Sequence, residues 1–292
     1  MKLSLLIPSC NRPDLLVEAL GSVYSQNYPE LEVIIIDDGS EPAVNEASLQ
    51  RSFDMNLRVI RNPRSLGIGQ VREQGAREAT GDLVWQLDDD DLLAADAVST
   101  CVRAFQHNPN LEVLFVNIGC FGKFKARRRQ AQGEALARLA SLLDIDPACG
   151  DTLLLGKRLL PALLFTVPMA FQHPVVRRAS LLRVSNLRLL GLGGSGNGAC
   201  GPGNEQSIPD NLNESEWSIY ASAICCCGFL SRPLYLTRCD DQGYFSVDAN
   251  KDILLREHLR LKRRLFENRN RLPELKPWKW QLRSAYARAL LE

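Results

Sequence analysis

Apolar positions in the first 118 residues follow two spacings that alternate along the chain. Short and nearly continuous apolar runs predict strands that are buried on both faces, near residues 3–8, 32–36, 57–60, 83–87 and 112–117. Apolar residues at helical spacing predict amphipathic helices between them, near residues 13–25, 42–53, 68–79 and 93–107. Strands and helices in this order predict a doubly wound α/β fold with a mainly parallel sheet.

Two of the predicted strands end in carboxylates. Asp37 and Asp38 follow the second strand, and the run from Asp88 to Asp91 follows the fourth. Ligands of an open parallel sheet bind beyond the carboxyl ends of its strands, so both groups can face one site. Adjacent carboxylates repel one another unless a cation compensates them, and Mg²⁺ or Mn²⁺ binds one or two carboxylates together with substrate phosphates. The run therefore predicts a metal–diphosphate site, with a solvated acidic turn as the alternative.

Several short motifs occur in order across residues 1–118. They are Ile7-Pro8-Ser9-Cys10-Asn11-Arg12-Pro13, Ser25-Gln26-Asn27-Tyr28-Pro29, the run from Val33 to Ser40, Asn62 with Gly67 and Arg72, Ala79-Thr80-Gly81-Asp82, and the run from Leu87 to Asp91. This series resembles the signature of family 2 glycosyltransferases. The resemblance implies a GT-A fold whose nucleotide-sugar-binding half is residues 1–118. It also implies a nucleotide-sugar donor, with a UDP-sugar favoured, Mn²⁺ or Mg²⁺ as cofactor, and inverting transfer.

The resemblance also assigns roles to individual residues. Asp90 is expected to bind the metal, and Asp88 or Asp89 to contact the ribose or the donor sugar. Asp38 is expected to accept a hydrogen bond from the N–H of uracil, and Arg72 to reach the base or the phosphates. The residues expected to line the nucleotide pocket are Pro8, Ser9, Asn11 and Arg12.

The segment around residues 213–217 resembles the family segment that carries the catalytic base at the start of a helix. Glu214 falls where the family has its catalytic aspartate, and Asn213 where it has a glutamate. An ordinary glutamate is ionised at neutral pH and can accept the proton of an acceptor hydroxyl, so Glu214 is the predicted base. Glu216 and Asp210 are the alternatives, and a capping role at the helix N-terminus is a further alternative for Glu214. The chain has no Gln-x-x-Arg-Trp motif after this point, which favours the transfer of a single sugar over processive synthesis.

The remaining chain divides into three expected regions. Residues 119–170 are expected to form a helical insertion near the acceptor. The basic run 123–129 within this insertion is expected to be a solvated face rather than a phosphate site. Residues 171–245 read as the acceptor-binding half, in which His173 is expected to be structural rather than a ligand of donor or acceptor. The glycine-rich segment 191–203 is expected to be a loop, because no clear strand precedes it and no clear helix follows it. Residues 246–292 are expected to form a basic helical extension.

The last 42 residues differ in charge from the rest of the chain. Residues 251–292 carry 12 Lys and Arg against 5 Asp and Glu, a net charge of +7, so the rest of the chain carries −6. An apolar stripe along this segment predicts a helix that packs on the catalytic domain. Its basic residues and tryptophans suggest a second possibility, contact with an anionic membrane surface. Such a contact would suit a lipid-linked acceptor.

Composition narrows the remaining function classes. The overall net charge of +1 argues against general nucleic-acid binding. The spacing of the 9 cysteines fits neither a disulfide framework nor a metal site, which predicts free thiols in a reducing compartment. The sequence shows neither a signal peptide nor a membrane span of about 18 apolar residues. A cytoplasmic protein, with contact at the inner face of the membrane, is the resulting expectation.

Two other classes compete with the transferase. A non-catalytic sugar-nucleotide-binding protein would keep the donor site and lack the base, and Asn213-Glu214 in place of Glu-Asp keeps this class open. A dinucleotide-dependent oxidoreductase is disfavoured, because the first strand lacks a following Gly-x-Gly-x-x-Gly turn.

Overall fold

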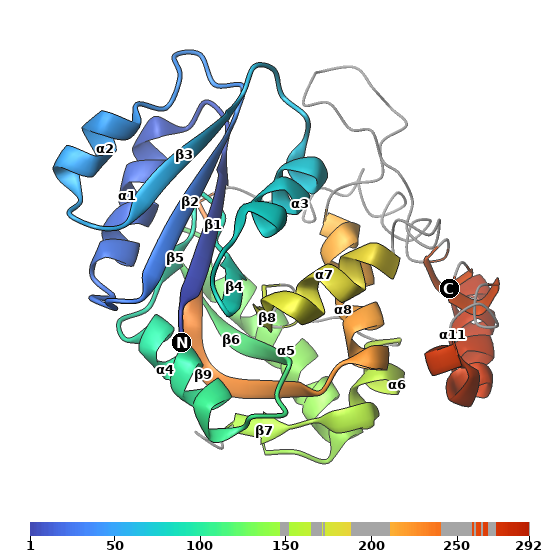
Figure 1. Cartoon of the computed structure of the whole chain (residues 1–292). Coiled ribbons are helices and arrows are strands. Elements are labelled where there is room, and N and C mark those ends of the chain that lie inside the picture. The colour runs from blue at the N-terminus through green and yellow to red at the C-terminus, as the bar shows by residue number, and fades with distance from the viewer. Residues whose placement is uncertain are drawn as a thin grey trace.

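The computed structural model of the chain is a central sheet with helices on both faces (Figure 1). It describes residues 1–146, 152–164, 171, 173–187, 211–240, 259, 261–263, 265–267 and 273–291. The strands are β1 Leu3–Ser9, β2 Leu31–Asp38, β3 Leu57–Asn62, β4 Leu83–Gln86, β5 Leu92–Leu93, β6 Val113–Phe121, β7 Thr152–Leu154, β8 Val175–Arg177 and β9 Cys227–Arg238. The α-helices are α1 Pro13–Tyr24, α2 Glu46–Ser52, α3 Ile68–Glu78, α4 Ala97–His107, α5 Lys125–Leu143, α6 Leu159–Leu163, α7 Arg178–Leu187, α8 Asn211–Ile224 and α11 Lys279–Leu291, and η1 Gly156–Arg158 and η4 Pro273–Trp278 are 3₁₀ helices.

The strand order is β3-β2-β1-β4-β8-β6-β9-β5, with β7 paired to β9. Strands β1 to β4 are mutually parallel, and β6 is parallel to β9. The short strand β8 lies between β4 and β6 and is antiparallel to both, so β4 and β6 run in the same direction. The carboxyl ends of β1, β2, β3, β4, β6 and β9 therefore lie along one edge of the sheet.

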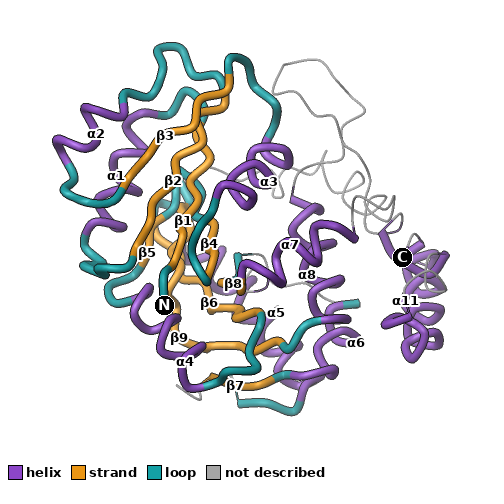
Figure 2. The backbone as a smooth tube through the Cα atoms, viewed as in Figure 1, coloured by secondary structure: helices purple, strands orange, loops and turns teal. Residues whose placement is uncertain are grey.

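Two apolar cores cover the two faces of the sheet. Alternate residues of each central strand enter different cores, because successive side chains of a strand point to opposite faces. Leu5 and Val33 pack with α1, α2 and α4, whereas Leu6 and Ile34 pack with α3, α5, α6, α7 and α8. Figure 2 shows the strands as a central layer between these two groups of helices. The continuous apolar runs of the sequence are thus explained by burial on both faces.

The mainly parallel α/β architecture predicted from the sequence is confirmed, with differences at particular elements. The segment predicted as one helix near 93–107 begins with strand β5, and the helix itself starts at Ala97. Strand β6 continues to Phe121, past the predicted boundary at residue 118. The insertion contains helices α5 and α6, but it also contributes strand β7 to the sheet. Periodicity alone could not separate these short strands from helix, because a strand of two or three residues has no measurable period.

The C-terminal extension packs against the domain in the part that the structure describes. Leu275, Leu282 and Ala285 are buried in the same core as helix α8. The predicted glycine loop at 191–203 lies outside the described residues. None of the cysteines in the described part of the chain forms a disulfide. None of the helices in the described ranges combines the length and apolar character needed to cross a bilayer.

Candidate active site

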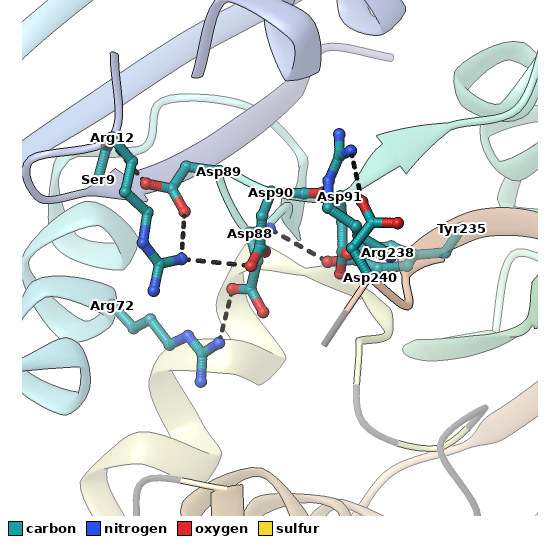
Figure 3. Close-up of polar contacts among 10 residues, drawn as sticks. All are labelled: Ser9, Arg12, Arg72, Asp88, Asp89, Asp90, Asp91, Tyr235, Arg238 and Asp240. Atoms are coloured by element: carbon teal, nitrogen blue, oxygen red, sulfur yellow. Dashed lines mark hydrogen bonds and ion pairs between the residues drawn. The ribbon is translucent and has the colours of Figure 1, made fainter. Parts of the chain in front are cut away.

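The turn from Asp88 to Asp91 follows strand β4 at the carboxyl edge of the sheet, where arginines from two other elements reach it (Figure 3). Arg72 of α3 donates to Asp88 over 2.8 Å. Arg12 lies between Asp89 and Asp90, with Nη1 at 3.1 Å and 3.2 Å from their carboxylate oxygens. The two acidic side chains nearest Arg12 thus share one guanidinium, so the turn keeps an excess of negative charge.

Residues of β1 and the turn after it complete the donor side of the site. Ser9 donates its hydroxyl hydrogen to Asp89 over 2.8 Å, and the preceding Pro8 is buried in β1. Asn11 has a φ of 55°, a left-handed conformation that asparagine tolerates better than most residues. Its backbone N–H donates to Ser40 Oγ, and its side-chain oxygen accepts from Glu41 N–H. Ser9 and Arg12 therefore contact the acidic turn, and Asn11 contacts the loop after β2. The role of these residues and of Pro8 in nucleotide binding stays a prediction.

The second half of the chain holds the other side of the acidic turn. Tyr235 of β9 accepts a hydrogen bond from the backbone N–H of Asp88 over 3.1 Å. Arg238 contacts two residues of the turn. The Arg238 backbone N–H donates to Asp91 Oδ1 over 2.8 Å, and Arg238 Nε donates to the carbonyl of Asp90 over 2.9 Å. Neither Tyr235 nor Arg238 was predicted as a site residue from the sequence. The only signal for them was a tyrosine and an arginine near the end of an apolar run, which is a common pattern in strands.

The electrostatics of the turn reflect this crowding. Burial raises the pKa of Asp89 and of Asp90, and the charge of Asp88 adds to the rise at Asp90. Burial and the charge of Asp88 raise the pKa of Asp91 to about 8. Asp88 is the exception: burial opposes its ionisation, but Arg72, together with His173 and Arg12, outweighs burial and lowers its pKa below the ordinary value. The arginines of the protein therefore neutralise only part of the carboxylate charge at this turn, and a bound cation could neutralise the rest.

The fit of a divalent cation rests on Asp90. Its side chain is 37% exposed, whereas Asp89 is 6% exposed and already bonded to Ser9 and Arg12. Among the described residues, no group of three or more His, Cys, Asp or Glu is arranged to hold a metal ion. A single exposed carboxylate fits Mg²⁺ or Mn²⁺, which take most of their ligands from water and from substrate phosphates.

The acidic pair after β2 has a different environment. Asp38 is 5% exposed, and its two oxygens accept hydrogen bonds from the chain that leads into α3. The donors to Asp38 are Asn62 Nδ2, Ser65 Oγ, and the backbone N–H groups of Leu66 and Gly67, at 2.7 to 3.1 Å. Asp38 therefore orders this loop, and the predicted contact with uracil would have to share an oxygen that already accepts two bonds.

The residues considered as catalytic base differ in their setting. Glu214 lies in the first turn of α8, which begins at Asn211. Glu216 is 2% exposed, so an acceptor hydroxyl cannot approach it without movement of α8. Asp210 lies outside the described residues. His173 is buried and stacks on Tyr235 with ring centroids 4.6 Å apart, which agrees with the structural role expected for it.

Comparison with known proteins places this geometry in a family. The family model described as glycosyl transferase family 2 matches residues 4–182, which is more than half of the chain. The chain belongs to glycosyl transferase family 2. The motifs that suggested the family, from Ile7 to Asp91, fall inside the matched range.

Curated relatives of this family 2 chain match part of it. An uncharacterized glycosyltransferase of Haemophilus influenzae is 32% identical over 118 residues, which are 40% of this chain and 39% of the relative. The GalNAc(5)-diNAcBac-PP-undecaprenol beta-1,3-glucosyltransferase of Campylobacter jejuni is 33% identical over 104 residues, 35% of this chain and 34% of the relative. The matched segments thus span well under half of the length of either relative.

Solved structures show the same fold over a longer range. The complex of residues 1–349 of S. aureus TarS with UDP-GlcNAc has a TM-score of 0.58 and 17% identity, covering 90% of this chain and 66% of that TarS fragment. The mannosyltransferase PcManGT of Pyrobaculum calidifontis, in complex with GDP-Man and Mn²⁺, has a TM-score of 0.54 and 16% identity. That match covers 99% of this chain and 73% of PcManGT. The GT-A fold of this family 2 chain is therefore confirmed.

Proposed function

We propose that this protein transfers one sugar, with inversion, from a nucleoside-diphosphate sugar to a glycan or lipid-linked acceptor, and that a UDP-sugar is the donor. The observation that carries the proposal is the acidic turn Asp88–Asp91, whose excess negative charge lies beside Arg12 and Arg72 at the carboxyl edge of the sheet. Membership of family 2 supports sugar transfer as the reaction, and the complex of TarS with UDP-GlcNAc supports a uridine donor.

The donor side acts by binding the diphosphate and stabilising it as it leaves. A Mn²⁺ or Mg²⁺ ion held by Asp90 would neutralise the charge that grows on the leaving diphosphate. Arg12 and Arg72, which lie against the turn, are placed to bind phosphate oxygens through their guanidinium groups. Asp88 and Asp89 remain the proposed contacts to the ribose or the donor sugar.

The acceptor side acts by removing a proton. Glu214, in the first turn of α8, accepts the proton of the acceptor hydroxyl as that oxygen attacks the anomeric carbon. Attack from the face opposite the diphosphate inverts the configuration at this carbon. The Campylobacter relative has a name that includes an undecaprenol-linked glycan, which supports a glycan or lipid-linked acceptor here.

A direct test measures donor binding and turnover together. Thermal shifts with UDP, GDP and dTDP, each with and without Mn²⁺, should rank the nucleotides, because a ligand at about 100 times its Kd stabilises a fold by roughly 2.7 kcal/mol. Turnover of the matching sugar nucleotides should then require Mn²⁺ or Mg²⁺. Donor binding with neither transfer nor donor hydrolysis would favour a non-catalytic sugar-nucleotide-binding protein.

The proposed base gives the second arm of this test. Glu214→Gln should retain donor affinity and lower turnover by roughly 10²- to 10⁴-fold, because only proton removal is lost. Glu216→Gln is the matched control on the same helix, and its turnover should stay within a few-fold of wild type. A large loss in Glu216→Gln with none in Glu214→Gln would transfer the role to Glu216.

The C-terminal extension supports a second component of the proposal, contact with an anionic membrane surface at the cytoplasmic face. Leu282 and Ala285 of α11 are buried, whereas Lys279, Trp280 and Arg283 are exposed. Trp280 is 68% exposed, and two cationic side chains lie near its ring. Lys279 Nζ is 6.0 Å and Arg283 Cζ is 5.8 Å from the ring centroid. An exposed tryptophan among basic residues is typical of a helix that lies at a lipid interface.

Vesicle sedimentation tests this surface. Binding to vesicles of phosphatidylcholine and phosphatidylglycerol should weaken with salt, and the double variant Lys279→Glu, Arg283→Glu should abolish it, since each basic residue near the lipid contributes about 1 kcal/mol. The matched control is Lys125→Glu, Arg127→Glu, which changes the net charge equally on the exposed part of α5. Wild-type protein that stays in the supernatant at low salt would leave the extension as a packing element only.

A further inference from the structure

Strand β9 contacts the acidic turn at three of its four residues. Its Tyr235 accepts the N–H of Asp88 over 3.1 Å, and the Tyr235 hydroxyl lies near the side chain of Asp91. Arg238 adds two contacts to the same turn, at the carbonyl of Asp90 and the carboxylate of Asp91. Asp89 is held from the other side, by Ser9 and Arg12. The turn that follows β4 is therefore held from one side by Ser9, Arg12 and Arg72, and from the other by a strand that lies 147 to 148 residues later in the chain.

The tyrosine that makes these contacts is itself held in place by packing. Tyr235 is fully buried, and its ring stacks on His173 with an interplanar angle of 6°. Trp85 of β4 lies on the same ring, with centroids 6.4 Å apart, and its Nε1–H donates to the carbonyl of His173 over 3.1 Å. Three buried aromatic side chains from three segments thus leave the Tyr235 hydroxyl little freedom to move.

A neutral hydroxyl is suited to this position because the turn carries like charges. The turn has four consecutive carboxyl groups, and Asp89 and Asp91 are buried, so little water screens the repulsion between the groups that are ionised. The Tyr235 hydroxyl accepts the N–H of Asp88 and adds no charge to the turn. The hydroxyl therefore gives the turn a fixed shape that the carboxylates alone would not keep.

We propose that Tyr235 is a positioning residue, which holds the Asp88–Asp91 turn in the conformation that binds the metal–diphosphate part of the donor. The functional part of this inference rests on the proposed donor. Strand β9 begins at Cys227, shortly after α8 ends at Ile224, so the strand that fixes the donor turn is continuous with the helix that carries the proposed base.

The variant Tyr235→Phe tests the hydroxyl and keeps the aromatic packing. Tyr28→Phe is the matched control, because the Tyr28 hydroxyl also makes one good hydrogen bond, 2.7 Å to the carbonyl of Met1, away from the turn. Hydrogen exchange of the segment 87–93, thermal unfolding, and the KM values for UDP-sugar and for Mn²⁺ are measured in each protein. We expect faster exchange at Asp88 and a rise of about tenfold in both KM values for Tyr235→Phe, with kcat nearly unchanged.

The readouts separate positioning from a loss of folded protein. Partial unfolding would lower kcat through the active fraction and would leave KM unchanged, and Tyr28→Phe should show no change in either KM. Wild-type exchange at Asp88, or wild-type KM values, in Tyr235→Phe would overturn the proposal. Failure of the wild type to bind any nucleotide sugar would refute the proposed function instead, and the exchange of segment 87–93 would still decide whether Tyr235 fixes the turn.

Discussion

The chain places two acidic groups at the same edge of its sheet, and they have opposite environments. Asp37 and Asp38, after β2, accept hydrogen bonds mostly from backbone N–H groups and from neutral side chains of adjoining loops. The run Asp88–Asp91, after β4, has four carboxyl groups and forms ion pairs with two arginines, Arg12 and Arg72, and the pKa of three of its four members is raised. Equivalent positions in the topology therefore do not imply equivalent roles.

The difference shows how a carboxylate can be assigned to structure or to binding. Burial opposes ionisation of Asp37, but hydrogen bonds from Ser40 and Val44 and the ion pair with Arg61 outweigh it, so its pKa is lowered. The charge of Asp37 thus stabilises the fold. The charges of Asp89 and Asp90 are disfavoured in the protein alone, which is the condition expected of groups that bind a cation.

The largest expected effect is on turnover, and it distinguishes a carboxylate that binds a cation from one that stabilises the fold. Asp90→Asn should lower Mn²⁺-dependent turnover by about 10²- to 10³-fold, because the cation contributes several kcal/mol to the transition state. The raised pKa of Asp90 means that its charge destabilises the folded protein at neutral pH, so the variant should unfold at the same or a higher temperature. Kinetics at saturating Mn²⁺ and thermal unfolding check both parts.

Asp54→Asn is the control for Asp90→Asn, because Asp54 is exposed in the loop between α2 and β3. Its turnover should equal that of the wild type. Unchanged Mn²⁺-dependent turnover in Asp90→Asn would remove the metal role from this residue. A large loss of stability would place Asp90 with the structural carboxylates.

The second effect is on stability and depends on pH. Asp37→Asn should lower the free energy of unfolding by roughly 2–3 kcal/mol at pH 7, since it removes charge-assisted hydrogen bonds from a fully buried side chain. The pKa of Asp37 is lower in the folded protein, so its contribution is present above the unfolded pKa of about 3.9 and is lost as pH falls through the folded pKa. Urea unfolding from pH 7 down to pH 3 should show the difference between variant and wild type narrowing. A difference that stays constant with pH would contradict this account.

Much of the donor side could be predicted because its motifs are local. The apolar runs that form β1, β2 and β4 end directly in the residues of interest, and a parallel sheet brings those ends together. The sequence therefore located the acidic turn and the residues after β1. It could not separate the roles of Asp38 and Asp90, because the hydrogen bonds to Asp38 come from the loop at Ser65–Gly67, whose path the apolar pattern does not specify.

The contacts made by Tyr235 and Arg238 could not be predicted for a related reason. They depend on the register of β9 against its neighbours, including the shifts opposite β6 near Val116 and Asn117. A shift of one residue would move Tyr235 to the other face of the sheet. No periodicity in the sequence indicates such shifts, so a residue distant in sequence from the acidic turn carried no signal of its role.

The smallest expected effect concerns Asp38, which orders the Ser65–Gly67 loop and is also the proposed contact to the uracil base. Asp38→Asn should cost about 1–2 kcal/mol of stability, because a neutral amide still accepts some of the bonds from the Ser65–Gly67 loop. Ser65→Ala is the matched variant, since it removes one donor to Asp38 and keeps the carboxylate. Titration of UDP and CDP separates the two roles, because N3 of uracil donates a hydrogen bond and N3 of cytosine accepts one. A contact with the base predicts that Asp38→Asn weakens UDP more than CDP, whereas a role through the loop alone predicts that both variants weaken the two nucleotides equally.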